Sequence, residues 1–164
     1  MIDFRGKKSP YFIDMRKEDI IMFVSQVVEN HGFFVVEVKI TPQGKLLIFM
    51  DGLAQKVTID DCVKVSRTIL EQHEEIAEQY GIEVSSPGLE NPFKVQEQYT
   101  KNIGNLVSVL LKDGKKISGK LIEHDTEKLF LEETRIRKEK KKKIKEKILH
   151  KLFFTQIKST KQII

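Results

Sequence analysis

The chain's histidines and its single cysteine are the first residues to test for chemistry, because imidazole and thiolate groups bind metal ions and attack substrates. No histidine has a second histidine three or four residues away in the sequence; they are His31, His73, His124 and His150. A zinc site built from neighbouring ligands therefore lacks its usual spacing. Cys62 is interpreted as a small apolar core residue, since free cysteine is among the most buried residue types. We expect neither a metal site nor a cofactor.

Two pairs of adjacent carboxylates, Asp60-Asp61 and Glu132-Glu133, could act as an acid and a base only if their side chains converged. Neighbouring side chains diverge by about 100° on a helix and point to opposite faces of a strand, so capping and solvation explain the pairs better. The sequence also lacks G-x-S-x-G, Walker A and G-x-G-x-x-G motifs. We expect a binding protein without a small-molecule substrate, not an enzyme. A pocket that gathers distant carboxylates is the third possibility.

The strongest signal is a basic run over residues 135–147, with nine lysines and arginines and two glutamates in thirteen positions. Lysine ammonium groups bind phosphate backbones and release condensed counterions, which gives affinity without sequence readout. RNA contact is one interpretation, and a solvated charged loop between two strands is the other. No RNP-type aromatic motif or GXXG loop accompanies the run. The RNA-binding candidates are Arg135, Arg137, Lys138, Lys140, Lys141, Lys142, Lys143, Lys145 and Lys147.

Charge is divided between the two halves of the chain, although the total is only +5. Residues 1–92 carry 10 Lys/Arg and 15 Asp/Glu, and residues 93–164 carry 19 and 9, so the halves have net charges of −5 and +10. The basic half predicts a polyanionic partner. The 40% of apolar residues indicates packed domains. A lone cysteine, no secretory signal and no apolar run of ~20 residues predict a cytoplasmic protein outside the membrane.

The elements that must position these residues follow from periodicity. Apolar residues recur at helical spacing from Ile20 to Val28, and Gly32 marks the end of this helix. Residues 34–40 alternate as a strand, and residues 46–51 return as a more apolar strand that helices cover on one face.

Thr58 and Asp61 have the spacing of a capping box for a second helix over residues 59–72, and residues 80–84 alternate as a third strand. The predicted order is helix, strand, strand, helix, strand. It forms a two-layer α/β domain over residues 14–86, preceded by a flexible N-terminal arm over residues 1–13.

A segment rich in proline and glycine ends this domain, and residues 87–92 are predicted to be a linker. It is a joint between domains or a contact loop, and the candidates are Ser85, Ser86, Pro87, Gly88 and Leu89. Short β-rich runs follow over residues 105–111, 116–125, 128–134, 144–153 and 160–163, the first two joined at the hairpin dipeptide Asp113-Gly114. Residues 93–164 are therefore predicted to form a small β-barrel with the basic run as a loop over residues 135–147. The fold class is α+β.

Residues 80–93, Tyr-Gly-Ile-Glu-Val-Ser-Ser-Pro-Gly-Leu-Glu-Asn-Pro-Phe, resemble the signature of the bacterial ribosome maturation factor RimP family. Residues 57–67 are similar to the family's second-helix segment, and Met50-Asp51-Gly52 matches the strand end before it. The resemblance spans about residues 15–164, although Asn91 stands where the family pattern usually has Arg.

The resemblance implies an N-terminal α/β domain, a C-terminal SH3-like or Sm-like barrel, and a non-catalytic role in maturing the small (30S) ribosomal subunit. Its implied partners are the free small subunit, with its 16S ribosomal RNA, and a basic ribosomal protein near the decoding region. We expect a monomer. The alternative function is an Sm-like RNA-binding or RNA-chaperone protein that acts away from the ribosome.

Overall fold

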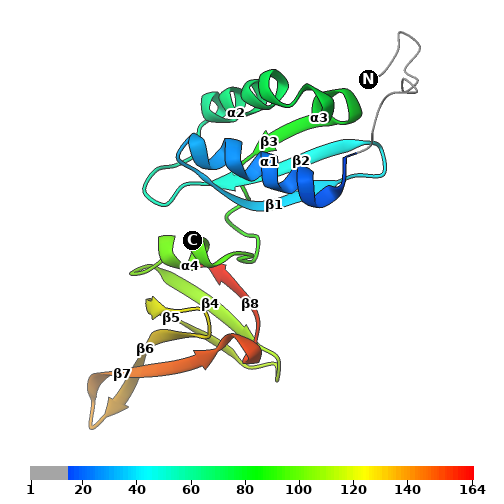
Figure 1. Ribbon diagram of the computed structural model, residues 1–164. Helices are drawn as coiled ribbons and strands as arrows, with labels where there is room; N and C mark the ends of the chain where they lie inside the picture. Colours follow the sequence, from blue (N-terminus) through cyan, green and yellow to red (C-terminus); the bar gives the residue numbers. More distant parts are fainter. Residues whose placement is uncertain (1–14) are drawn as a thin grey trace. The chain divides into compact units, whose positions relative to one another are not determined.

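A computed structural model describes residues 15–164, so the predicted arm over residues 1–13 lies outside the described part of the chain. The chain divides into two compact units, one ending at Pro87 and the other beginning at Gly88 (Figure 1). Among the described residues, no helix combines the length and the apolar character that a bilayer crossing requires. The mixed α+β class predicted from the sequence is confirmed, with helices and strands in both units.

The first unit contains a three-stranded sheet and three helices. In chain order these are α1 (Lys17–Asn30), β1 (Phe34–Ile40), β2 (Lys45–Asp51), α2 (Ile59–Gln72), α3 (Glu74–Gln79) and β3 (Gly81–Ser85). β2 lies in the centre, antiparallel to β1 and parallel to β3. The predicted order of helix, strand, strand, helix, strand is confirmed, and α3 is an additional short helix that the sequence pattern did not predict.

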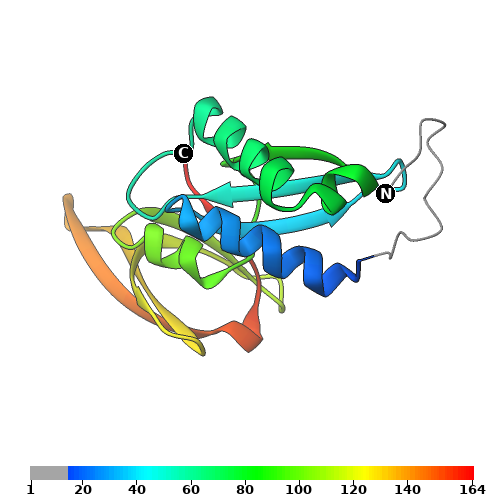
Figure 2. The ribbon, with the colours of Figure 1, turned by 45° about the horizontal axis from the view of Figure 1, so that its top comes forward.

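The core of this unit lies between the sheet and its helices. Leu46, Ile48 and Met50 alternate along β2 and are fully buried, so they share one face of the strand. They form one cluster with buried residues of α1, α2 and α3, among them Val24 and Ile69. Both long helices therefore cover the same face of the sheet, as Figure 2 shows.

The ends of α1 and α2 are fixed by the residues that the sequence indicated. Gly32 has a φ of +85°, a left-handed conformation that favours glycine, directly after α1. At the start of α2 the backbone N–H of Asp61 donates to Thr58 Oγ1 (3.1 Å), and the N–H of Thr58 donates to Asp61 Oδ2 (2.9 Å). The backbone N–H of Thr58, and next its hydroxyl group, both donate to Asp61 Oδ2 and hold the pKa of this carboxyl group below its usual value. The predicted capping box is confirmed.

The second unit is an antiparallel sheet with one short helix. In chain order it contains α4 (Gln96–Lys101), β4 (Leu106–Leu111), β5 (Lys116–His124), β6 (Lys128–Glu139), β7 (Lys142–Phe153), the 3-10 turn η1 (Phe154–Gln156) and β8 (Ile157–Gln162). The strand order is β7-β6-β5-β4-β8. In the described part of the chain β7 and β8 are the two edges and do not pair with each other, so the sheet is not closed and the predicted small β-barrel is not confirmed.

One face of this sheet forms the second core. Val107, Val109, Leu121, Leu129 and Leu131 are fully buried on it. Tyr99 of α4 packs edge-on against Phe93 and Phe154, with ring centroids 5.0 Å and 5.1 Å away. The helix α4 therefore belongs to the core of the second unit.

The basic run has a different secondary structure from the loop predicted over residues 135–147. β6 and β7 pair without interruption from Lys128 opposite Phe153 to Glu139 opposite Lys142. Only Lys140 and Lys141 remain for the turn, and both have a positive φ, of 47° and 66°. Two-residue turns with this geometry match the twist of paired strands. The loop prediction was wrong because it relied on charge, whereas cross-strand pairing decides the structure of the segment.

Candidate nucleic-acid interface

The pairing of β6 with β7 sorts the basic residues onto two faces. Directly opposite residues of an antiparallel pair share a face, and successive residues of a strand alternate between faces. Lys138 lies opposite Lys143, and Lys145 lies opposite Ile136. These residues lie on the face opposite the core residues Leu129, Leu131 and Leu152, and we call it the solvent face of the sheet.

The solvent face of the hairpin carries most of its charge. Between Lys128 and Phe153 it has six lysines and one glutamate, a net charge of +5; these residues are Lys128, Lys138, Lys143, Lys145, Lys147, Lys151 and Glu132. Among the residues that the structure describes, Lys138, Lys143 and Lys145 have no acidic partner within ion-pair distance. Ile136 and Leu149 lie on the same face and are 65% and 61% exposed. This face can present several ammonium groups to a phosphate backbone at once.

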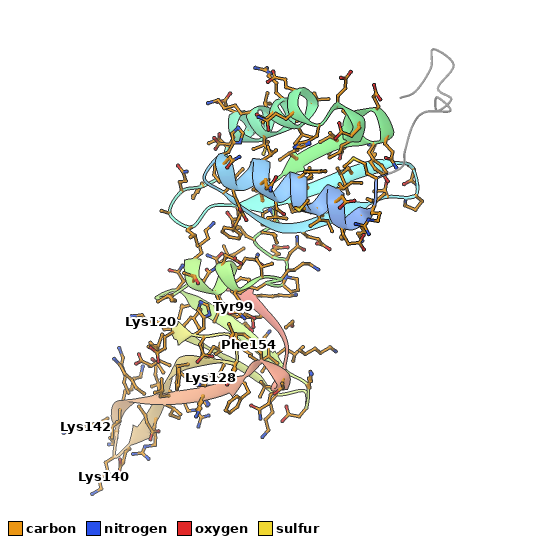
Figure 3. The ribbon with its side chains drawn as sticks, viewed as in Figure 1. Tyr99, Lys120, Lys128, Lys140, Lys142 and Phe154 are labelled. Atoms are coloured by element: carbon orange, nitrogen blue, oxygen red, sulfur yellow. The ribbon has the colours of Figure 1, made fainter. Side chains whose placement is uncertain are left out.

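The opposite face of the hairpin is electrically balanced. It carries three basic and three acidic residues, which are Arg135, Arg137, Lys142, Glu133, Glu139 and Glu146. Arg135 pairs with Glu133, and Arg137 Nη2 lies 3.5 Å from Glu139 Oε2. The nine RNA-binding candidates are therefore divided by the strand period: four lie on the solvent face, three on the balanced face, and Lys140 and Lys141 form the turn. Figure 3 shows Lys140 and Lys142 at the tip of the hairpin.

The solvent face continues across the neighbouring strands. Lys120 of β5 lies opposite Glu132 of β6 and Leu106 of β4. A hollow of about 360 Å³ opens there, lined by Leu106, Ser118, Gly119, Lys120, Glu132, Thr134, Lys147 and Ile163. A side chain at Gly119 would overlap the carbonyl oxygen of Glu132, so glycine permits the close approach of β5 and β6. The hydroxyl groups of Ser118 and Thr134 add hydrogen-bonding capacity beside the lysines.

Sequence reasoning missed the basic residues outside the run that this face includes. They are Lys116, Lys120, Lys128, Lys151 and Lys161, each paired by register with a residue of the solvent face. Alternation with a period of two along each predicted strand was the signal that could have identified them.

Lys128 also lies on this face, but it is engaged locally. Its Nζ lies 3.1 Å from Asp125 Oδ2, and the backbone N–H groups of Glu127 and Lys128 donate to Asp125 Oδ1. These hydrogen bonds lower the pKa of Asp125 to about 2, and the two that the backbone N–H groups donate contribute most. The Lys128 ammonium group thus helps to hold the turn between β5 and β6.

Two of the histidines that the sequence singled out have hydrogen-bond partners, and one of the acidic pairs is divided between two faces of a strand. His124 Nε2 lies 2.7 Å from Thr100 Oγ1, and its Nδ1 lies 2.9 Å from Gln96 Oε1, so this ring ties β5 to α4. His31 Nδ1 lies 2.8 Å from the carbonyl oxygen of Val27, at the end of α1. Glu132 and Glu133 lie on opposite faces of β6, as the strand period predicts.

The candidate contact loop lies between β3 and α4. Ser85 is the last residue of β3 and pairs with Phe49, and Ser86 to Leu89 follow it. The backbone N–H of Asn91 donates to the carbonyl oxygen of Gly88 (3.1 Å), which closes a turn. The joint and contact interpretations of this segment both stay predictions.

Comparison with known proteins identifies the relatives of this chain. The family model described as the RimP N-terminal domain matches residues 23–90. Two relatives from strains of Porphyromonas gingivalis, both named ribosome maturation factor RimP, are each 40% identical over 120 residues, which cover 73% of this chain and 78% of theirs. The resemblance to this family that the sequence indicated is therefore confirmed. The chain belongs to the ribosome maturation factor RimP family.

Proposed function

We propose that this protein is a non-catalytic maturation factor for the small (30S) ribosomal subunit. Family membership supports the role in ribosome maturation. The observation that supports binding to RNA is the solvent face of the hairpin, where lysines without acidic partners among the described residues gather on one side of two paired strands. The proposed partners are 16S ribosomal RNA and a basic ribosomal protein near the decoding region.

The two units have different tasks in this proposal. The N-terminal α/β domain, residues 14–86, faces the basic protein, and residues 93–164 contact RNA phosphates, with residues 87–92 as the linker. We assign the second unit to the SH3-like or Sm-like barrels. Five antiparallel strands with a core on one face and a 3-10 turn before the last strand support this assignment. We further propose that the factor is a cytoplasmic monomer.

The proposed mechanism is selective binding. A ligand stabilises whichever state of its partner it binds more tightly. A factor that prefers a partly assembled subunit over wrongly packed alternatives raises the population of the productive state, and no bond needs to be made or broken.

Sedimentation tests the role. The purified protein is expected to migrate with free small subunits in a density gradient, and a strain without its gene is expected to accumulate immature small subunits. Normal maturation in that strain would contradict the proposal. The same basic face could serve an RNA chaperone that acts away from the ribosome. Migration with a broad pool of small RNAs instead of subunits would favour that second function.

The salt dependence of binding tests the face that contacts RNA. Replacing Lys138, Lys143 and Lys145 with glutamine should weaken binding to small-subunit RNA. It should also flatten the slope of log K against log salt by about 2, because each lost phosphate contact removes about 0.7 to 0.9 of slope. Fluorescence anisotropy over a salt series measures both quantities.

The balanced face supplies a matched control. Replacing Arg135, Arg137 and Lys142 with glutamine removes the same three charges from the same hairpin, so the long-range field changes equally. A much smaller change of slope is expected, since Arg135 and Arg137 have glutamate partners. Equal slopes for the two triple variants would show that total charge, and not one face, determines the affinity.

A further inference from the structure

The acidic excess of the first unit lies in only some of its elements. Residues 15–56 carry five basic and five acidic residues, so their net charge is zero. Residues 57–86, which form α2, α3 and β3, carry two basic and seven acidic residues, so their net charge is −5. The negative field of this unit therefore originates at one side of the fold.

The same elements enclose an apolar groove. It has a volume of about 430 Å³ and is lined by Ile59, Cys62, Val63, Ser66, Arg67, Leu70 and Val84. Ile59, Val63 and Leu70 are 85%, 44% and 51% exposed, although they recur on one side of α2. Val65 and Ile69 already bury the other side of this helix in the core. An apolar stripe on the outer side of a helix is typical of a binding surface.

The groove lies beside the free edge of a sheet. Val84 belongs to β3, which is the last strand of its sheet and pairs only with β2 among the described residues. An extended segment can bind along such an edge through its backbone and place alternate side chains in a neighbouring groove. Figure 2 shows the edge strand β3, in green, beside α2.

We propose that this groove binds an extended, basic segment of a small-subunit ribosomal protein. Apolar side chains of the segment fill the space beside Ile59, Val63 and Leu70. Arg67 also lines the groove, but the net charge of the surrounding elements is −5. The lysines and arginines of the segment face these acidic surroundings, so charge complementarity selects the segment and the apolar groove holds it. This inference rests on the proposed function only for the identity of the protein that provides the segment. The groove and the charge around it are features of this chain itself.

Two glutamates near the end of α2 and at the start of α3 can contribute to this charge, and Glu71 directly follows the groove residue Leu70. Glu71 and Glu74 are exposed and have no ion-pair partner among the described residues. Three other acidic residues of these elements are engaged: Asp60 Oδ2 lies 3.1 Å from Lys64 Nζ, Asp61 caps α2, and Glu83 Oε1 lies 2.9 Å from Lys45 Nζ. Glu71 and Glu74 can therefore be neutralised without removing a described ion pair.

Cys62 provides a reporter inside the groove. It is the only cysteine of the chain and is partly exposed, so an alkylating reagent labels one position. Burial and the neighbouring Asp61 raise the pKa of its thiol, so free and bound protein must be compared at one pH. A segment lying in the groove should slow alkylation at least fivefold.

The experiment measures Cys62 alkylation in the full chain alone, with purified small subunits, and with two synthetic ten-residue peptides. One peptide alternates valine with lysine, and the other alternates valine with glutamate. Small subunits and the lysine peptide are expected to slow alkylation, and the glutamate peptide is not. If the chain migrates with subunits but Cys62 reacts as fast as in free protein, the groove inference is wrong while the proposed function stands. If the lysine peptide protects Cys62 but the chain does not bind subunits, the proposed function fails.

Variants separate groove contact from general attraction. Val63→Ser and the pair Glu71→Gln/Glu74→Gln should each weaken binding of the lysine peptide about tenfold. Met22→Ser and the pair Glu18→Gln/Glu29→Gln are matched controls on α1, with one exposed apolar and two exposed acidic side chains outside the groove. Equal losses in the control variants would overturn the assignment.

Two other occupants would also overturn it. Faster alkylation after deletion of residues 1–13 would show that the chain's own N-terminal segment occupies the groove. Alkylation that slows as protein concentration rises would indicate a second copy of the chain. Rates unaffected by both changes support an external segment.

Discussion

Tyr99 makes a polar contact at the centre of the second core. Its hydroxyl group donates to Thr160 Oγ1 over 2.9 Å, and the two residues are only 8% and 1% exposed. Burial raises the pKa of Tyr99, which keeps its hydroxyl proton available for this bond. The bond joins α4 to β8, the strand at one edge of the sheet. A buried hydroxyl group that loses its partner destabilises the folded state more than the bond itself stabilises it.

The pair can be tested by a double-mutant cycle. Tyr99→Phe and Thr160→Val are each expected to lower the free energy of unfolding by about 1–2 kcal/mol, because each leaves one buried hydroxyl group unsatisfied. The double variant should lose clearly less than the sum, since neither hydroxyl group then remains. Urea unfolding measures all three values. Strictly additive losses would show that the two hydroxyl groups do not depend on each other.

The basic hairpin combines regular strands with an unusual turn. Lys140 and Lys141 both occupy left-handed backbone conformations, where asparagine and glycine are the favoured residues. Each non-glycine residue in this backbone conformation destabilises the folded state by about 1–2 kcal/mol. The turn is therefore the least stable part of the hairpin, although it connects two strands of twelve residues each.

Replacing Lys140 with Asn and Lys141 with Gly should stabilise this turn by about 1 kcal/mol, which slows amide exchange near the tip about fivefold. Hydrogen exchange followed by mass spectrometry measures the effect. Glutamine at both positions is the control, because it removes the same two charges and keeps side chains that disfavour the left-handed conformation. Equal protection in both variants would show that the slower exchange comes from reduced charge repulsion and not from the backbone conformation.

Elements with a strong internal period could be predicted from the sequence. Thr58 and Asp61 identified the start of α2, and the near-continuous apolar character of residues 46–51 identified the central strand. The helix α4 was missed because Val95 stands at its N-cap, where a serine or threonine would signal the start of a helix. Only one half of a capping box is present there, in which the side chain of Gln98 accepts the backbone N–H of Val95. The face on which each lysine lies was also missed. It follows from strand pairing, which a run of like charges does not reveal.

At the scale of the whole molecule, two cores share no residue. The first includes Ile69, and the second includes Leu131. The chain divides between Pro87 and Gly88, and each unit has its own sheet. Units that have separate cores can unfold separately.

Calorimetry tests this independence. Ile69→Ala and Leu131→Ala each remove a fully buried side chain and should destabilise the unit that contains it by about 2–5 kcal/mol. Two unfolding transitions are expected, and each variant should shift only one of them. A single transition that both variants shift would show that the units fold as one cooperative body.

The edge position of β7 has a consequence for aggregation. β7 is twelve residues long and pairs with β6 along one side. Among the described residues, the backbone groups along its other side pair with no strand. Long edge strands recruit copies of themselves, and natural proteins prevent this by placing lysines on them. Five of the twelve residues of β7 are lysines. Repulsion between these lysines keeps neighbouring molecules from joining their sheets, so the residues proposed to attract RNA also protect the free protein from self-association.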